Sequence, residues 1–234
     1  MSFQGFPVAA LDFYDDLEVD NTKSFWDAHK DVYAEQVKAP MVALTDALAQ
    51  EFGAAKVFRP YRDVRFAKDK TPYKTHQGAF VGVAPATGWY VEVAAPGVRV
   101  GGGIYEASGE RLAAIREAMA EDKTGKALQR ILRDLERGGF EVAGERLKTV
   151  PRGYDKEHPR IDLLRMKTVL GMRSYGFEPF VHTAEPARPG PGGLAPATPA
   201  DQLAGDRGLL TALSRPGPGT PRGWSPAARC AARR

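Results

Sequence analysis

Basic side chains are concentrated in one short stretch of the chain, between positions 59 and 76. Guanidinium groups match the paired oxygens of phosphates and carboxylates, and lysines add further positive charge. We therefore interpret this stretch as a candidate anion site, in which Asp63 and His76 are the candidates for general acid–base catalysis. The expected ligand-binding residues of the stretch are Arg59, Arg62, Arg65, Lys68, Lys70, Tyr73 and Lys74.

The first half of this stretch, residues 57–66, has the pattern of a β-strand. Alternate side chains of a strand share one face, so Arg59, Tyr61, Asp63 and Arg65 are expected to lie together. Two guanidinium groups around a carboxylate are typical either of a structural salt-bridge ladder or of a binding site. The sequence leaves both alternatives open.

A second basic and aromatic stretch covers residues 151–160. His158 and Arg160 stand at the predicted start of a helix, where backbone N–H groups favour anions. The alternative is an ordinary loop followed by a helix cap. The further residues expected to contact a ligand or to line its pocket are Tyr105, Arg152, Tyr154, His158 and Arg160.

The elements that must position these residues can be predicted from periodicity. Helical spacing predicts helices from Pro7 to about 17, from Thr22 to about 37, and from Met41 to Gly53 after an interruption at Pro40. Further helices are expected from Ser108 to about 120, from Thr124 to about 137 and from Pro159 onward. Strands are expected over residues 57–66, 79–83, 89–94, 98–100, 140–143 and 176–183.

This order of elements predicts an α+β fold, in which helices pack on a mainly antiparallel sheet within a single domain of residues 1–183. The chain of 234 residues is long enough for one such core. No apolar run reaches the length of a membrane helix, and we expect no membrane partner. A single cysteine and the lack of a signal-peptide pattern favour a cytoplasmic location.

Net charge is +4, but its distribution argues against nucleic-acid binding by the domain. Residues 184–234 hold seven arginines and three acidic residues, whereas residues 1–183 hold 26 basic and 26 acidic residues. Since phosphate-driven affinity depends on the cations engaged, we do not expect the domain to bind nucleic acid non-specifically. The four histidines show no metal-ligand spacing, so neither a metal nor a cofactor is expected.

Residues 59–75 contain the pattern R-x-x-R-D-x-R-F-x-x-D-K-x-P-Y-K-T. This pattern resembles the signature of a widespread, mainly bacterial family of conserved hypothetical proteins of about 230 residues, a domain of unknown function. Residues 26–30, 100–105 and 158–160 are similar to further stretches of the same family. The resemblance covers about residues 7–183, and it implies a family without implying a reaction.

The composition changes sharply after Thr183. Residues 184–234 contain no Val, Ile, Phe, Tyr, Met or Lys, and they hold nine of the 18 prolines. Such a segment cannot bury enough apolar surface to fold, so we expect a disordered tail. Ala, Gly, Pro and Arg have GC-rich codons, which favours an out-of-frame reading of a GC-rich gene. A natural Pro- and Gly-rich tail is the alternative.

Three functions remain open at this level. The first is a binding or catalytic site for an anionic small molecule bearing phosphate or carboxylate groups. The second is a nucleic-acid-binding module that uses the same basic segment, with Tyr61 and Tyr73 for stacking. The third is a non-catalytic interaction protein in which the segment is only a structural ion-pair network. The sequence decides neither whether the protein is an enzyme nor its oligomeric state.

Overall fold

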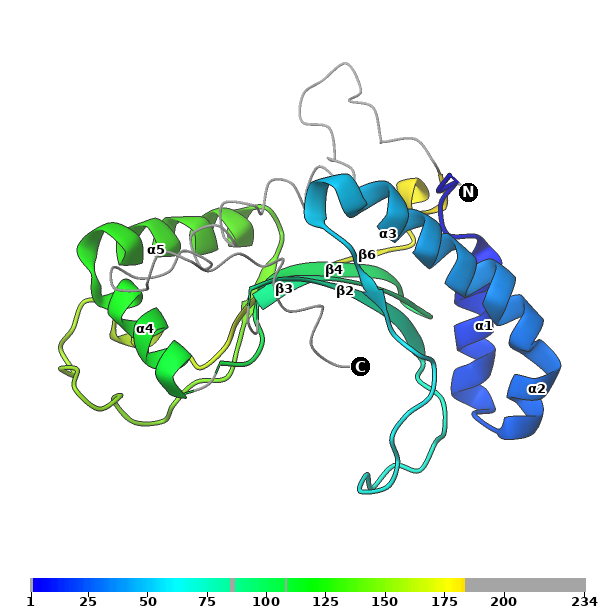
Figure 1. Ribbon diagram of the computed structural model, residues 1–234, viewed down its shortest axis with the longest axis horizontal. Coiled ribbons are helices and arrows are strands. Elements are labelled where there is room, and N and C mark those ends of the chain that lie inside the picture. The colour runs from blue at the N-terminus through cyan, green and yellow to red at the C-terminus, as the bar shows by residue number, and fades with distance from the viewer. Residues whose placement is uncertain (1, 85–86, 108, 184–234) are drawn as a thin grey trace, which may run out of the picture.

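In the part of the chain that the structure describes, six antiparallel strands form one sheet at the centre of the fold (Figure 1). The strands are β1 (Lys56–Val57), β2 (His76–Ala84), β3 (Thr87–Ala94), β4 (Gly97–Ile104), β5 (Glu141–Ala143) and β6 (Val169–Gly176). Their order in the sheet is β1-β2-β3-β4-β6-β5, so the predicted meander of three consecutive strands is confirmed. With helices packed on it, the sheet confirms the predicted α+β class.

The computed structural model describes residues 2–84, 87–107 and 109–183. The expected tail, residues 184–234, and the predicted cap Ser108 lie outside the described residues. Within the described part of the chain, no helix combines the length and apolar character that crossing a membrane requires.

An N-terminal layer of helices consists of α1 (Val8–Val19), α2 (Lys23–Val32), the π-helix η1 (Tyr33–Lys38) and α3 (Ala39–Phe52). Thr22 caps α2 as predicted, because its hydroxyl accepts a hydrogen bond of 3.2 Å from the Phe25 N–H. Pro40 has no N–H to donate, and its ring would clash with the carbonyl four residues earlier in a regular α-helix. The wide turn of η1 accommodates Pro40, so the predicted interruption is a change of helix type rather than a break.

Two further helices, α4 (Gly109–Ala120) and α5 (Asp122–Arg137), follow the meander. The predicted cap of α5 at Thr124 is wrong by three residues, because Glu121 is the N-cap and Thr124 lies inside the first turn. Its hydroxyl instead donates a hydrogen bond to the Ala118 carbonyl, which belongs to the end of α4. α5 ends before Gly138 and Gly139, as predicted, and the φ of 83° at Gly139 explains the glycine there.

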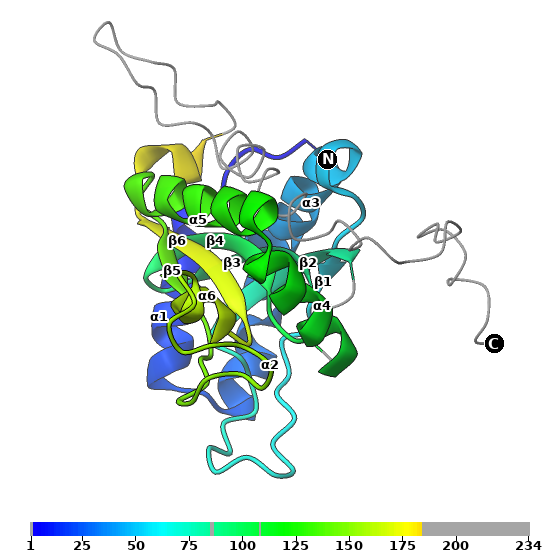
Figure 2. The same ribbon diagram turned by 90° about the vertical axis from the view of Figure 1, so that its left-hand side faces the viewer.

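The predicted strand over residues 57–66 is largely wrong. Only Lys56–Val57 pairs with β2, and the chain then leaves the sheet. Residues 58–75, here called the arm, form two limbs that pair with each other: the Arg62 N–H donates to the Pro72 carbonyl at 2.9 Å, and the Lys74 N–H donates to the Pro60 carbonyl at 2.8 Å. The segment therefore satisfies its backbone locally and projects from the body (Figures 1 and 2).

The predicted last helix is present but shorter than expected, and the predicted last strand is wrong. The helix α6 covers Ile161–Leu164, so Thr168 lies outside it, and β6 begins at Val169. The predicted strand at 176–183 is instead the 3-10 helix η2 (Pro179–His182). Gly176 at a φ of 57° ends β6, and Pro179 fits the first turn of a helix, which explains the change of structure between them.

The two faces of the sheet differ in what lies against them. One face, here called the covered face, carries Trp89, Val91 and Val93 of β3, which are buried beneath the helices. Trp89, for example, meets Phe52 of α3 edge to face, with ring centroids 5.5 Å apart. On the opposite face, here called the open face, the side chains are half-buried or exposed. These side chains include His76, Phe80, Tyr90, Glu92, Arg99 and Met172.

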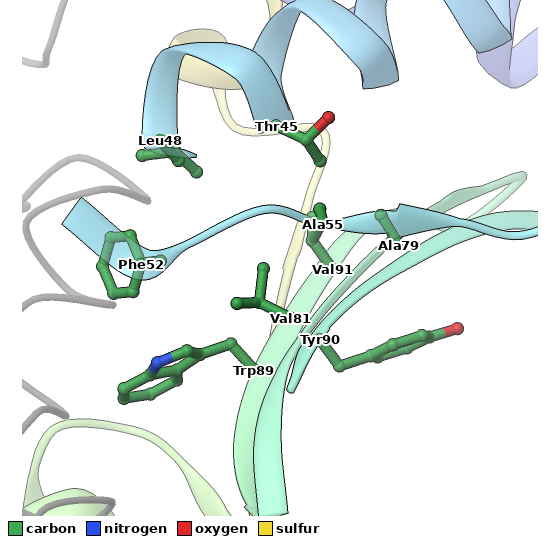
Figure 3. A pocket seen from close by; sticks show the side chains of 9 residues that line it. All are labelled: Thr45, Leu48, Phe52, Ala55, Ala79, Val81, Trp89, Tyr90 and Val91. Atoms are coloured by element: carbon green, nitrogen blue, oxygen red, sulfur yellow. The ribbon is translucent and has the colours of Figure 1, made fainter. Parts of the chain in front are cut away.

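A small cavity lies between α3 and the covered face (Figure 3). Thr45 and Leu48 of α3 border it from one side, and Val81 and Val91 border it from the sheet. Its volume of about 30 Å³ suits a single water rather than a metabolite. Tyr90 alternates with Trp89 and Val91 along β3, so its ring lies on the open face rather than in this cavity.

Candidate functional site

The arm is fixed to the N-terminal helices at one point near its base. The side-chain amide of Asn21 donates to the Tyr73 carbonyl at 3.0 Å and accepts from the Tyr73 N–H at 3.1 Å. The Tyr73 ring stacks on Trp26, with centroids 4.3 Å apart and planes 7° from parallel. Tyr73 is thus buried as a structural anchor, and this contact sets the direction in which the arm leaves the body.

Polar side chains brace the arm from within. Arg62 donates to Asp69 and, at 2.5 Å, to the Thr71 hydroxyl, and so joins the two limbs. Asp69 also accepts from the Thr71 N–H at 2.9 Å. These bonds, first the one from the Thr71 backbone and then the one from Arg62, lower the pKa of Asp69 to about 2. Asp69 therefore keeps its charge and its bracing role at any ordinary pH.

Asp63 and Arg65 form an exposed pair beyond the brace. The guanidinium of Arg65 donates to both carboxylate oxygens, at 2.9 and 2.6 Å, and thereby lowers the pKa of Asp63. Lys68 and Lys70 are exposed nearby, and Lys70 donates to the Val64 carbonyl at 2.9 Å. These four residues lie in the outer part of the arm, on the far side of the Arg62–Asp69 brace from the sheet.

Cations gather at the arm base, where the arm joins β2. Burial lowers the pKa of Lys74, and the nearby charge of Arg59 lowers it further. Burial also lowers the pKa of His76; Glu92 opposes this shift, whereas Lys74 and Arg62 add to it. Within the described part of the chain, no ion pair includes Arg59 or Lys74. The arm base therefore gathers basic side chains whose charged forms disfavour one another, although Arg62 is itself paired with Asp69.

The neighbouring strands add three polar residues that the sequence reasoning missed. The Tyr90 hydroxyl donates to a Glu92 carboxylate oxygen at 2.5 Å, and Arg99 of β4 lies 3.9 Å from the other oxygen. Glu92 lies beside Gly78 in the register of β2 and β3, two residues from His76 along the strand. The alternation of polar Tyr90 and Glu92 with apolar Trp89, Val91 and Val93 was a signal in the sequence for this open face.

Two aromatic rings of the open face lie over glycines. A Cβ atom added to Gly88 would lie 2.3 Å from Cζ of Phe80, and one added to Gly78 would lie 2.6 Å from the Tyr90 hydroxyl oxygen. Each ring therefore covers a glycine of the adjoining strand, one register position away. Tyr105, just after β4, meets Phe80 edge to face at 5.2 Å and is 47% exposed. The open face thus combines aromatic rings at one end with charged groups at the other.

The second predicted stretch, residues 151–160, lies at the opposite end of the molecule from the arm (Figure 1). Arg160 is only 4% exposed, and its guanidinium donates to the Met119 carbonyl at 2.8 Å and to the Ala120 carbonyl at the end of α4. It also pairs with Asp122 at 2.9 Å. Arg160 therefore joins α4 and α5 to the loop, and we leave it out of the proposed site.

The other predicted residues of this stretch also lie away from the arm. Arg152 is exposed, His158 accepts a hydrogen bond of 3.1 Å from the Arg160 N–H, and Tyr154 has its pKa raised by burial and by Glu117. Of the predicted residues, the structure therefore brings together Arg59, Arg62, Lys74, His76 and, further along the open face, Tyr105. It does not bring Arg152, Tyr154, His158 or Arg160 to them.

These features define the class of protein: an α+β domain with one open sheet face and a braced basic arm beside it. The chain belongs to the family of conserved hypothetical proteins DUF2461, whose model matches residues 9–187. Comparisons with curated proteins and with solved structures give no match. Within the described residues, no group of three or more His, Cys, Asp or Glu side chains could hold a metal ion.

Proposed function

We propose that the arm base and the adjoining open face bind an anionic small molecule that carries phosphate or carboxylate groups. The observation that carries this proposal is the cation cluster of Arg59, Arg62, Lys74 and His76. In that cluster the pKa values of Lys74 and His76 are both lowered. Burial and like charges disfavour the charged forms of these groups, and a bound anion would offset both penalties because an opposite charge nearby stabilises the charged forms. Such sites are where ligands and catalytic groups are commonly found.

Each residue has a distinct part in the proposed site. Arg59 and Lys74 provide charge that no carboxylate of the described residues neutralises within ion-pair distance. Arg62 is held in place by Asp69 and Thr71, so that it needs little reordering on binding. His76 is the better candidate for proton transfer, because its lowered pKa favours the neutral, basic imidazole. Asp63 is occupied by Arg65 in the outer arm.

A thermal-shift titration of the full chain with pyrophosphate, at constant ionic strength, tests this proposal. A ligand that binds only the folded state raises the melting temperature by mass action. We expect an increase for the wild type that Lys74→Met abolishes. Lys68→Met is the matched control, since it removes the same charge from the exposed outer arm and should leave the increase intact. Equal responses of the two variants, or no response of the wild type, would contradict the proposal.

Nucleic-acid binding stays the second candidate because of two side chains on the arm. Tyr61 is 50% exposed and Phe66 is 96% exposed, beside the basic groups. Exposed rings in a basic segment suit single-stranded nucleic acid. Anisotropy of a labelled oligonucleotide at two salt concentrations distinguishes the two functions. Salt-sensitive binding that Phe66→Ser weakens and pyrophosphate does not displace would favour the arm as a nucleic-acid module.

We also propose that residues 59–75 are the family's signature segment and that residues 184–234 are read out of frame. The composition of the final 51 residues supports the second part, since apolar side chains other than Ala, Leu, Trp and Cys are absent there apart from proline. Resequencing the gene tests it. Reads that confirm the present frame, with no Leu-rich helical continuation in either other frame after Thr183, would overturn it.

A further inference from the structure

We infer that the anion bound at the arm base belongs to a nucleotide, a nucleoside di- or triphosphate, whose aromatic base packs against Phe80 and Tyr105 at the other end of the open face, stacked on the exposed Tyr105 ring and edge-on to Phe80. This inference rests on the proposed anion site, and it adds the identity of the rest of the ligand. Three features support it: the rings of Phe80 and Tyr105, the spacing along β2 and the carboxylate of Glu92.

The rings on the open face offer an unused stacking surface. One side of the Phe80 ring lies against Gly88, where no side chain would fit beneath it. Phe80 is half-buried, so part of its surface remains accessible. Aromatic rings that shield glycines also occur for purely structural reasons. Shielding of Gly88, however, does not account for Tyr105, which adds a second ring at 5.2 Å and leaves 47% of its surface exposed.

The spacing between the two ends of the open face sets the length of the ligand. His76 and Phe80 lie on the same strand and the same face, four residues apart. A strand rises about 3.3 Å per residue, so the two positions are roughly 13 Å apart. An aromatic acid with its charge directly on the ring cannot reach both ends. A base joined through a sugar to two or three phosphates can.

The residues between the two ends suit the sugar. Glu92 lies beside Gly78, midway between His76 and Phe80 in the register of the strands. Its side chain is 18% exposed, and the Tyr90 hydroxyl and Arg99 hold the carboxylate in place. Carboxylates accept hydrogen bonds from ribose hydroxyls in other nucleotide sites. The Tyr90 ring covers Gly78 at this point of the sheet, so the sugar would lie against that ring rather than against the backbone.

The experiment is calorimetric titration of the full chain with ADP and, separately, with pyrophosphate. We expect ADP to bind at least tenfold more tightly than pyrophosphate, because stacking of a base adds affinity. Tyr105→Ser should weaken ADP roughly fivefold or more and leave pyrophosphate unchanged. The matched control is Tyr61→Ser, which removes a tyrosine of similar exposure, 50% against 47%, from the arm instead. It should leave ADP affinity unchanged.

The outcomes separate this inference from the anion site itself. Equal affinities for ADP and pyrophosphate, both lost in Lys74→Met, would overturn the nucleotide and leave the anion site standing. Weakening of ADP by Tyr61→Ser but not by Tyr105→Ser would also overturn it. Binding of neither probe by the wild type would remove both proposals. Titrations with GDP and UDP then measure how far the site distinguishes one base from another.

Discussion

The covered face and the open face belong to the same strands, yet they are built from different kinds of residue. On β3, Trp89, Val91 and Val93 point into the core, whereas Tyr90 and Glu92 point to the open side. Burial of the first set stabilises the fold by about 25 cal/mol for each Å² of apolar surface removed from water. Tyr90 and Glu92 contribute little to the stability through burial of apolar surface. The contrast indicates that folding constrains one face and leaves the other available for recognition.

The largest effect expected from this contrast comes from placing a charge on each face. Val93→Asp buries a carboxylate at a position that is 0% exposed, and it should lower the free energy of unfolding by at least about 3 kcal/mol. Ala94→Asp places the same charge one residue later on the open face, where about 1 kcal/mol or less is expected. Urea denaturation followed by circular dichroism measures both. Equal losses would show that the two faces are not distinct.

A smaller effect tests whether the rings on the open face require their glycines. Gly88→Val would place a Cβ 2.2 Å from the Val81 carbonyl oxygen and 2.3 Å from the Phe80 ring, and it should cost about 2 kcal/mol. Gly82 is the cross-strand partner of Gly88, and a Cβ there would meet only Phe80 at 3.5 Å. Gly82→Val should therefore be nearly neutral. The shift in urea midpoint checks the pair, and a neutral Gly88→Val would argue against the ring's position over Gly88.

The link between the arm and the helices should be worth about as much as one or two hydrogen bonds. Asn21→Ala removes both bonds to the Tyr73 backbone and should destabilise the domain by about 1–2 kcal/mol. Asn21→Asp keeps the acceptor for the Tyr73 N–H but turns a carboxylate oxygen toward the Tyr73 carbonyl, so it should lose at least as much as Asn21→Ala. Thermal unfolding measures the difference. If Asn21→Ala melts like the wild type, the stacking of Tyr73 on Trp26 fixes the arm alone.

The smallest expected effect is a pH dependence of the folding stability, caused by His76 on the open face. Burial lowers its pKa, so the unfolded chain, with a histidine pKa of about 6.5, binds more protons than the folded one. The stabilisation is therefore fully present above about pH 6.5 and is lost as the pH falls through the lower, folded pKa. His76→Gln should flatten the stability profile between pH 7.5 and 5. An unchanged profile would assign the dependence to other groups.

The affinity for an anion should change with pH in the opposite direction to the folding stability. A bound anion stabilises the protonated imidazole, so the affinity for sulfate, whose own charge is constant over this range, should rise as the pH falls. His76→Gln should remove that rise. A pH-independent affinity in the wild type would place the anion away from His76.

The sequence predicted the elements that depend on local pattern and missed those that depend on pairing between segments. The cap at Thr22 and the three-strand meander follow from neighbouring residues alone, and both are confirmed. Residues 57–66 have a strand-like pattern, but whether a strand joins the sheet depends on which segment it meets. Here the first limb meets residues 72–74 of its own arm. The strand β6 was hidden for the same reason, since its partners are β4 and β5.

The candidate site shows the same division. Residue type alone pointed to Lys74 and His76, but it could not separate them from Arg160, whose charge serves the join between α4 and α5. Nor could it show that Tyr73 is an anchor, because its stacking partner Trp26 is distant in the sequence. Glu92 and Tyr90 were recognisable only once the open side of β3 was known.

The π-helical turn η1 has a consequence for how insertions and deletions act on this chain. Successive residues of an α-helix are offset by about 100° around its axis. Removing one residue between Tyr33 and Lys38 would take away the wide turn that accommodates Pro40, and it would rotate the part of the helix that follows by that angle. Met41 and Leu44 would then turn from the core toward solvent. The extra residue in η1 therefore keeps Met41 and Leu44 facing the core. A single-residue deletion there should be tolerated less well than the same deletion in the outer arm.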